Sequence, residues 1–343
     1  MPIVQIITTG GTIAHNIDPA TGAALPTLSG EELVAEVPAL AGVAQVRVTE
    51  FSLLQSWNMT PALAADLARR VGDALVDPAV TGVVMTHGTD TMEETSFALD
   101  LVLDTPRPVV FTGAMRNPSQ PGPDGPRNVV SAARVAADPA ARDLGVLVVL
   151  NDEIHAARYV TKGHTTALHT FVSRGVGPIG LVDDEGVWVR WRPARLPRLP
   201  LVDPDPHVYL IKMAAGMDDL FLHSALDAGA RGVVIEGSGA GHTPATWEPA
   251  IGALVQAGVP VVLVSRVGAG RVAAIYGGAG GGRSLRALGV VPGGDLTGPK
   301  AQVALSFALG AGMDVAAIRD YFSHVGTSVG AYCIRPDGEH PGS

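Results

Sequence analysis

Two glycine turns hold the side chains of this chain whose types and spacing could perform chemistry. Residues 8–12 read Thr-Thr-Gly-Gly-Thr, and residues 86–91 read Thr-His-Gly-Thr-Asp-Thr. Thr12 and Thr89 supply hydroxyl groups that could act as nucleophiles. A threonine hydroxyl is a weak nucleophile until a neighbouring base removes its proton. Each turn therefore offers a nucleophile that still needs a base.

Lys162 is the candidate base, and Asp90 is the carboxylate that could hold it in place. A lysine amine accepts a proton only when desolvation or another cation has made it neutral. Each residue also has a simpler explanation: Thr12 as a turn hydroxyl, Lys162 as a solvated side chain, and Asp90 as a helix cap. Capping explains one polar group, but not four hydroxyls and carboxylates within six residues. The second turn is therefore interpreted as part of a site.

Short apolar strands are predicted immediately before both turns, at residues 3–7 and 82–85. A helix is predicted from Met92, directly after the second turn. Glycine turns between a strand and a helix are where α/β folds bind ligands, and a helix N-terminus favours an anion. The two turns, although far apart in sequence, are therefore expected to meet around one cleft.

The remainder of the chain predicts an α/β fold with a doubly wound, mostly parallel sheet. Strands alternate with helices up to residue 150, and parallel order follows from such alternation. Only 5% of the 343 residues are aromatic, whereas 47% are hydrophobic, which is typical of α/β layers. We expect an N-terminal catalytic domain at 1–192, a proline-rich linker at 193–206 and a smaller α/β domain at 207–343.

Composition also limits the partners and cofactors. The net charge is −9 without any basic cluster, which argues against nucleic acid and anionic membranes. The only cysteine is Cys333, and the ten histidines lack metal-ligand spacing, so neither a metal nor another cofactor is expected. No signal peptide or membrane-length apolar run is visible, which predicts a cytoplasmic protein. Residues 15–27 form a polar loop after Thr12, interpreted as a lid.

The two turns resemble the signatures of the bacterial-type L-asparaginase/glutaminase family. Residues 9–14 match the first signature, and residues 87–95 match the second. Further matches occur at 113–116, at 124–128, and from 151–152 through 160–162, and the resemblance returns weakly at 299–301. Two long signatures at matching spacing make the resemblance specific, and it covers most of the first domain.

The resemblance implies an amidohydrolase that converts a side-chain amide to acid and ammonia. Thr12 would attack the amide, and Thr89, Asp90 and Lys162 would activate Thr89 or the water. Backbone N–H groups near Gly11 and Thr89 would stabilise the oxyanion.

The resemblance also implies the substrate contacts and the assembly. Ser56 and the Gly88 amide would bind the substrate carboxylate, with Trp57 adding an apolar wall. The remaining substrate contacts would come from Gly11, Thr89 and Asp90. Family members are commonly dimers or tetramers, so a homodimer or homotetramer is expected.

The departures from the family pattern concern the substrate. Ala24 or Leu25 stands where a tyrosine is usual, and His242 replaces an asparagine of the C-terminal loop. Residues 266–294 contain no acid that could pair with a substrate ammonium. Loss of such a partner costs a few kcal/mol of affinity. L-asparagine is therefore hypothesised to be a weak substrate.

Three alternatives to an asparaginase remain open at this point. The first is an amidase or esterase for bulkier, less charged substrates, and the second is a non-catalytic small-molecule sensor. The third, a component of an amidotransferase, is less expected, since nothing extends the N-terminus for a tRNA partner. The intact set of Thr12, Thr89, Asp90 and Lys162 argues against the sensor.

Overall fold

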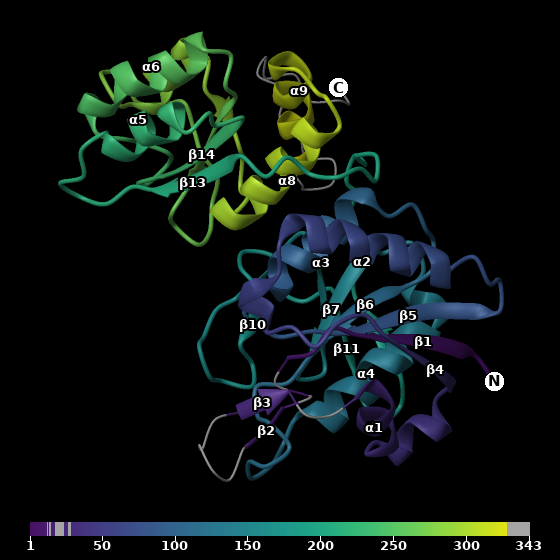
Figure 1. Cartoon of the computed structure of the whole chain (residues 1–343). Coiled ribbons are helices and arrows are strands. Elements are labelled where there is room, and N and C mark those ends of the chain that lie inside the picture. The colour runs from purple at the N-terminus through teal and green to yellow at the C-terminus, as the bar shows by residue number, and fades with distance from the viewer. Residues whose placement is uncertain (12, 14, 18–23, 27–28, 328–343) are drawn as a thin grey trace, which may run out of the picture.

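The chain forms two α/β units that pack against each other (Figure 1). The structure is a computed structural model, and it describes residues 1–11, 13, 15–17, 24–26 and 29–327. Two parts of the predicted site region, Thr12 and most of the predicted lid, lie outside the described residues. Within the described part of the chain, no helix has the length and apolar character that crossing a membrane requires.

The N-terminal unit is built on an eight-stranded sheet in the order β12-β11-β8-β7-β6-β5-β1-β4. Its parallel strands are β1 (Ile3–Thr8), β4 (Gln45–Glu50), β5 (Val80–Thr86), β6 (Val109–Thr112) and β7 (Val146–Leu150). Its antiparallel strands are β8 (Glu153–Ala156), β11 (Gly180–Val182) and β12 (Val187–Val189). This arrangement confirms the predicted mostly parallel sheet, with the short β segments after residue 153 as its antiparallel extension.

Helices cover both faces of this sheet (Figure 1). On one face lie α2 (Pro61–Ala74) and α3 (Met92–Val102), and on the other lie α1 (Gly30–Ala35) and α4 (Gly125–Ala137). Alternate residues of β5 enter the two cores: Met85 packs with α2 and α3, whereas Val84 packs with α4. Two of these helices begin at capped residues, α1 at a capping box on Ser29 and α2 at the Thr60 hydroxyl.

The C-terminal unit contains a four-stranded parallel sheet in the order β13-β14-β15-β16. Its strands are β13 (Val208–Lys212), β14 (Gly232–Gly237), β15 (Val261–Ser265) and β16 (Val291–Pro292). Its helices are α5 (Leu220–Asp227), α6 (Glu248–Gln256), α7 (Gly282–Leu288), α8 (Gly298–Gly310) and α9 (Val315–Val325). Both α7 and β16 escaped prediction because they are short and have no periodic pattern of their own.

Helix α8 joins the two units, because it lies between the C-terminal sheet and α3 (Figure 1). Apolar residues of α3, α8 and β14 belong to one continuous buried cluster. The predicted linker follows this junction, since Leu196 and Leu199 are buried and the Leu199 N–H donates to the Leu101 carbonyl (2.8 Å). The division at residues 192 and 207 stays a prediction.

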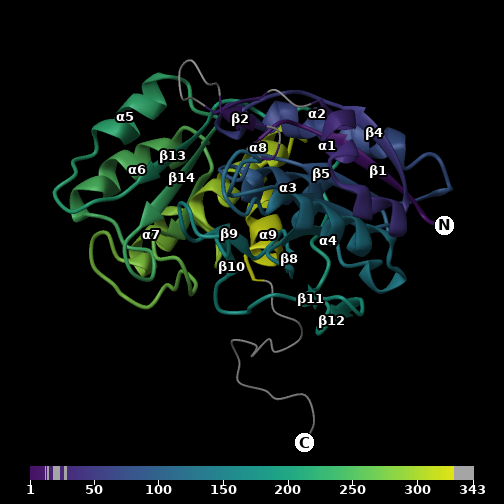
Figure 2. The ribbon, with the colours of Figure 1, turned by 90° about the horizontal axis from the view of Figure 1, so that it is seen from below.

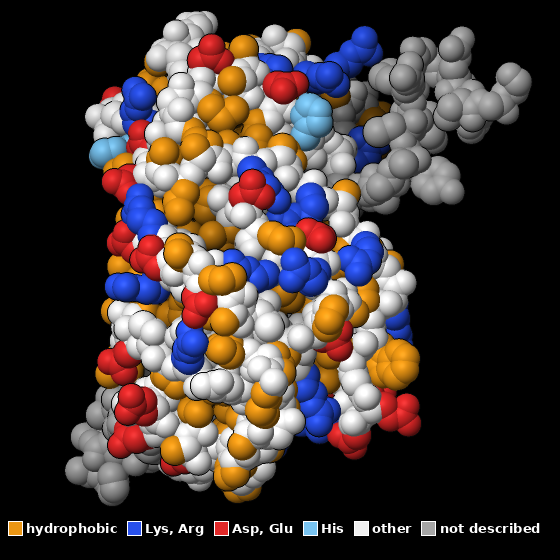
Figure 3. Space-filling view, turned by 90° about the vertical axis from the view of Figure 1, so that its right-hand side faces the viewer, with side chains coloured by type: hydrophobic (Ala, Val, Ile, Leu, Met, Phe, Trp, Pro, Cys, Tyr) orange, Lys and Arg blue, Asp and Glu red, His pale blue; other side chains and the backbone are white. Residues whose placement is uncertain are grey.

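Short elements complete the structure. The paired strands β9 (Val160–Lys162) and β10 (Phe171–Ser173) form a separate antiparallel hairpin. The predicted polar loop at 15–27 is partly wrong, since β2 (His15–Ile17) and β3 (Ala24–Pro26) pair antiparallel. The 3-10 helices are η2 (Pro38–Gly42), η3 (Ser56–Asn58), η4 (Pro139–Ala141) and η5 (Ala245–Trp247). On the face shown in Figure 3, basic and acidic side chains are interspersed.

Candidate active site

The two glycine turns lie in direct contact at the carboxyl ends of β1 and β5. Gly11 has a φ of 89°, and a Cβ atom on it would lie 2.5 Å from the Gly88 nitrogen. The Thr9 hydroxyl donates to the Thr86 carbonyl across the same junction (3.0 Å). Only glycine at position 11 allows the backbones to approach so closely. The expected meeting of the two turns is therefore confirmed for the residues that precede Thr12.

Lys162 reaches this junction from β9, although it lies 73 residues after Thr89 in the sequence. Its Nζ atom donates to the Thr89 Oγ1 atom at 2.9 Å and to the Asp90 Oδ1 atom at 2.7 Å. The Lys162 side chain is 17% exposed and the Asp90 side chain 49%, so solvent reaches the pair. The tertiary structure thus brings together the hydroxyl, the carboxylate and the amine that the sequence singled out.

The helix-cap explanation of the second turn does not describe this geometry. Thr91 occupies the N-cap position of α3, but its side chain makes no capping hydrogen bond. Its hydroxyl instead donates to the Ser56 carbonyl (2.7 Å). Because the Asp90 carboxylate accepts from Lys162, neither polar side chain is used to satisfy the helix start.

The predicted substrate-binding residue Ser56 is buried beside the same turn. Its Oγ atom accepts from the Asp90 N–H at 3.3 Å, and a Cβ on Gly88 would lie 2.5 Å from that Oγ. A hydroxyl that accepts one hydrogen bond keeps its own proton for donation, so Ser56 can still donate to an anion. Its neighbour Trp57 is 64% exposed, and its role as a substrate wall stays a prediction.

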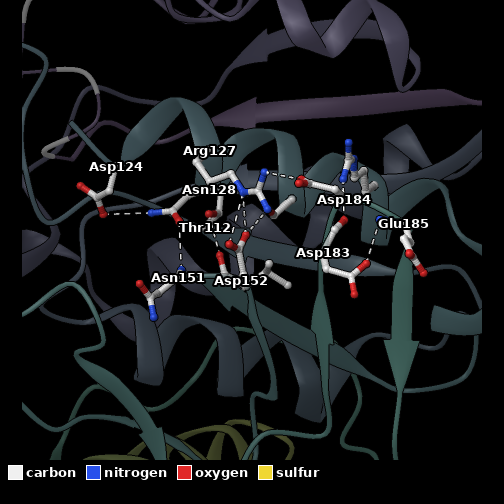
Figure 4. Close-up of polar contacts among 12 residues, drawn as sticks. Thr112, Asp124, Arg127, Asn128, Asn151, Asp152, Asp183, Asp184 and Glu185 are labelled. Carbon is white, nitrogen blue, oxygen red and sulfur yellow. Dashed lines mark hydrogen bonds and ion pairs between the residues drawn. The ribbon is translucent and has the colours of Figure 1, made fainter. Parts of the chain in front are cut away.

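A polar network joins Asp124, Asn128 and Asn151 (Figure 4). Asn128 donates through Nδ2 to the Gly113 carbonyl (2.9 Å) and to Asp124, and accepts through Oδ1 from the Asn151 N–H. A Cβ on Gly113 would lie 3.5 Å from the Thr89 Cγ2 atom. This network therefore gives a structural reason for the polar motifs at 113–116, 124–128 and 151–152.

Three buried ionisable groups have shifted pKa values: His87 in the second turn, Glu94 at the start of α3, and Lys300. Burial lowers the pKa of His87 to about 4, although its contact with the Gly88 carbonyl opposes the shift. Burial, assisted by the Glu93 charge, raises the pKa of Glu94 to about 7. Burial also lowers the pKa of Lys300 to about 7, against the attraction of Glu93. The region around the second turn and the start of α3 is therefore a low-dielectric environment in which charge is costly.

Two residues of this region escaped the sequence reasoning. Glu93 lies in the first turn of α3, and its Oε2 atom accepts from the Lys162 N–H at 3.0 Å. Lys300 was noticed only within a weak match, and its partners lie more than one hundred residues away. Neither role has a local sequence signal. Among the residues that the structure describes, no group of three or more His, Cys, Asp or Glu could hold a metal ion.

Family comparisons give this geometry a context. The family model described as "Asparaginase, N-terminal" matches residues 3–195, and that of the "Glutaminase/Asparaginase C-terminal domain" matches residues 207–322. The chain belongs to the asparaginase/glutaminase family. The predicted family assignment and fold class are thereby confirmed.

Individual relatives cover nearly the whole chain. It is 35% identical to the L-asparaginase of Bacillus licheniformis over 306 residues, which are 89% of this chain and 95% of the relative. It is 36% identical to one of the subunits of the glutamyl-tRNA(Gln) amidotransferase of Archaeoglobus fulgidus over 324 residues, 90% and 75% of the two chains.

A solved structure shares the fold. The crystal structure of a probable cytoplasmic L-asparaginase from Campylobacter jejuni superposes with a TM-score of 0.84 and 30% sequence identity. The match covers 94% of this chain and all of the other chain. The protein is therefore an amidohydrolase that acts on amides.

Proposed function

We propose that this protein hydrolyses the side-chain amide of L-asparagine, or of a related small amide, through a threonine nucleophile. The observation that carries the proposal is the pair of hydrogen bonds from Lys162 to Thr89 and Asp90. Such a hydroxyl–amine–carboxylate set is what activation of a nucleophile without histidine needs. The contact between Gly11 and Gly88 supports the assignment of Thr12, which follows Gly11, to the same site.

The reaction divides into two acyl transfers. The Thr12 hydroxyl oxygen attacks the amide carbonyl carbon, the C–N bond breaks, and the nitrogen leaves with a proton as ammonia. Water then attacks the resulting ester, the C–O bond to Thr12 breaks, and the acid is released. Backbone N–H groups near Gly11 and Thr89 stabilise the oxyanion of each tetrahedral intermediate.

Lys162 and Asp90 manage the proton in this scheme. As an ammonium, Lys162 donates to both Thr89 and Asp90, so it must release a proton before it can accept one. The neutral amine then takes a proton from the attacking water, either directly or through the Thr89 hydroxyl, which gives its proton to Lys162 and receives that of the water. The proton returns to the Thr12 oxygen when the ester C–O bond breaks. Asp90, 2.7 Å away, stabilises the ammonium that forms.

The substrate need not carry an ammonium group. Residues 266–294 contain no carboxylate, and Trp57 adds exposed apolar surface next to Ser56. An amide with a carboxylate and no ammonium would still find the Ser56 hydroxyl. The ammonium of L-asparagine would find only Asp90 among the predicted substrate contacts, and Asp90 already pairs with Lys162. We therefore expect the des-amino amide succinamate to rival L-asparagine.

The test is ammonia release from L-asparagine, L-glutamine and succinamate, with wild type and Thr12→Ala. Loss of a nucleophile should lower kcat by about a thousandfold or more. Full activity in Thr12→Ala would refute the nucleophile assignment. A kcat/KM for L-asparagine far above the other two would refute the altered substrate preference.

The relatives that belong to glutamyl-tRNA(Gln) amidotransferases support a second candidate function, a part in such an amidotransferase. The measurement that separates the two candidates is amide hydrolysis with and without glutamyl-tRNA(Gln). Stimulation of ammonia release by the tRNA would favour the amidotransferase, and an unchanged rate would favour free hydrolysis.

The expected assembly and location belong to this proposal as well. A homodimer or homotetramer would allow a neighbouring chain to cover the exposed side of the site at Trp57. A cytoplasmic location is supported by the likeness to the probable cytoplasmic L-asparaginase of Campylobacter jejuni. Sedimentation at several protein concentrations tests the assembly, since a monomer at all concentrations would exclude it.

A further inference from the structure

A fully buried lysine lies beneath the candidate site and is not used by the proposed chemistry. Lys300 is on α8, in the C-terminal unit, and only 2% of it is exposed. Its Nζ atom donates to the carbonyls of Ala157 (2.7 Å), Arg158 (3.2 Å) and Val160 (2.5 Å). An ammonium has three donors, so these three carbonyls satisfy it completely.

Two of the three carbonyls, those of Ala157 and Arg158, lie in the turn that leads into β9, and the third belongs to Val160, the first residue of β9. Lys162 is the last residue of β9, two positions after Val160. From the other side, the Glu93 carboxylate accepts from the Lys162 N–H at 3.0 Å. Arg158 extends the anchoring, because its Nε atom donates to the Val325 carbonyl (3.0 Å) and its guanidinium pairs with Asp295. In the view of Figure 2, β9 and β10 are drawn between α7 of the C-terminal unit and α4 of the N-terminal unit.

This arrangement is more elaborate than packing requires. A buried ammonium is costly unless it is fully hydrogen-bonded, and an apolar side chain of similar length would fill the same space at no such cost. The Lys300 Nζ atom also lies 5.6 Å from the centre of the Phe97 ring, which adds a cation–π contact. The backbone before Lys162 is thus held at several points by one side chain from the other unit.

We propose that Lys300 is a positioning residue for Lys162. By holding the carbonyls of the turn, it fixes the path of β9 and thereby the distance from the Lys162 amine to Thr89 and Asp90. The C-terminal unit in this way sets the geometry of a site that lies in the N-terminal unit. The inference rests on the proposed catalytic role of Lys162.

The chain contains only three lysines, Lys162, Lys212 and Lys300, which makes a direct measurement possible. Labelling with lysine carrying carbon-13 at Cε gives three NMR signals, assigned through Lys162→Met and Lys212→Met. The test variant is Lys300→Met, which keeps the length of the side chain and removes all three donors. Lys212, which is exposed on β13, supplies the matched control Lys212→Met.

In Lys300→Met we expect kcat to fall at least tenfold, KM to change less than twofold, and the Lys162 signal to move toward that of the exposed Lys212. Lys212→Met should change none of these. If Lys300→Met does not fold, Lys300→Gln, which keeps two donors, should show the same changes to a smaller degree. A folded variant with normal kcat and an unmoved Lys162 signal would overturn the proposal. So would lower thermal stability as the only effect, since that indicates a purely structural lysine.

Failure of the proposed function is distinguishable from failure of this inference. If Lys162→Met retained wild-type amide hydrolysis, the catalytic role of Lys162 would be refuted. The NMR signal would still report whether Lys300 positions that side chain, because it does not depend on activity.

Discussion

Glycine turns stand at the carboxyl ends of parallel strands in both units, but only those of the N-terminal unit form a candidate site. In the C-terminal unit, the turn after β14 satisfies its own polar groups. The Ser238 Oγ atom donates to the His242 carbonyl (3.2 Å), and the Ser265 Oγ atom donates to the Gly239 carbonyl (2.6 Å). In the N-terminal unit, Thr89 and Asp90 both receive hydrogen bonds from Lys162 instead.

This difference shows what a glycine turn can and cannot do. The turn lets backbones approach closely and aims small polar side chains at a sheet edge. Chemistry needs in addition a charged group from another part of the chain, and Lys162 comes from 73 residues beyond Thr89. Equivalent changes in the two units should therefore have unequal effects.

Removal of the distant amine should have the largest effect. Lys162→Met is expected to lower kcat for amide hydrolysis by about 10² to 10⁴, the usual contribution of a positioned acid or base. Lys212→Met, at the sheet of the C-terminal unit, should change kcat by no more than about twofold, since the exposed Lys212 side chain pairs with Glu236 and not with Thr89 or Asp90. Initial rates of ammonia release measure both, and equal losses in the two variants would contradict the comparison.

The next largest difference is expected between alanine substitutions in the glycine turns of the two units. In Gly11→Ala the new Cβ would meet the Gly88 backbone, and a φ of 89° is strained for alanine. We expect a loss of about 3 kcal/mol in the free energy of unfolding. Gly239→Ala has a φ of 53° but its nearest contact is 3.7 Å away, so about 1 kcal/mol is expected.

Urea denaturation with activity assays at each step measures both glycine variants. Gly11→Ala should lose activity even where it is folded, because the turn that carries Thr12 must shift. An active, stable Gly11→Ala would show that the two turns do not need to touch.

The titration of Glu94 makes the cost of a buried charge near the second turn measurable. Burial raises its pKa from 4.5 to about 7, so the folded state binds its proton more tightly than the unfolded state does. Its contribution to stability is full below pH about 4.5 and is lost as the pH rises to about 7. The loss amounts to about 3 kcal/mol at 1.36 kcal/mol per pKa unit.

Glu94→Gln isolates this contribution, because glutamine does not ionise. Its free energy of unfolding relative to wild type should rise between pH 4.5 and 7. The pH dependence of wild-type stability alone would not reveal this contribution. Burial also lowers the pKa of His87 and of His155 to about 4, so these two histidines make the folded protein less stable as the pH falls. If the difference in free energy of unfolding between Glu94→Gln and wild type did not depend on pH, the raised pKa of Glu94 would be contradicted.

The smallest effect is expected at the self-satisfied turn. Ser238→Ala removes one hydrogen bond to the His242 carbonyl and should cost about 1 kcal/mol of stability. Amide hydrolysis should stay unchanged, because nothing in the C-terminal turn reaches Lys162 or Thr89. A large loss of activity would show that this turn belongs to the site after all.

Much of the fold could be predicted from the sequence, because the signals are local. Apolar strands, helical periodicity and the caps at Ser29 and Thr60 depend on neighbours a few residues apart. The glycine turns and the reactive residue types were also readable, as was the family resemblance. Whether Thr12 attacks first stays a prediction, since it lies outside the described residues.

Local patterns did not reveal the contacts that Glu93 and Lys300 make near the site. The hydrogen bond from Lys162 to Glu93 and the hold of Lys300 on the turn at 157–160 join segments that are far apart in sequence. Side-chain identity decides which chemistry a residue can perform, and this is determined by the sequence alone. Distance, burial and the resulting pKa values depend on which segments pack together, and only the tertiary structure decided those.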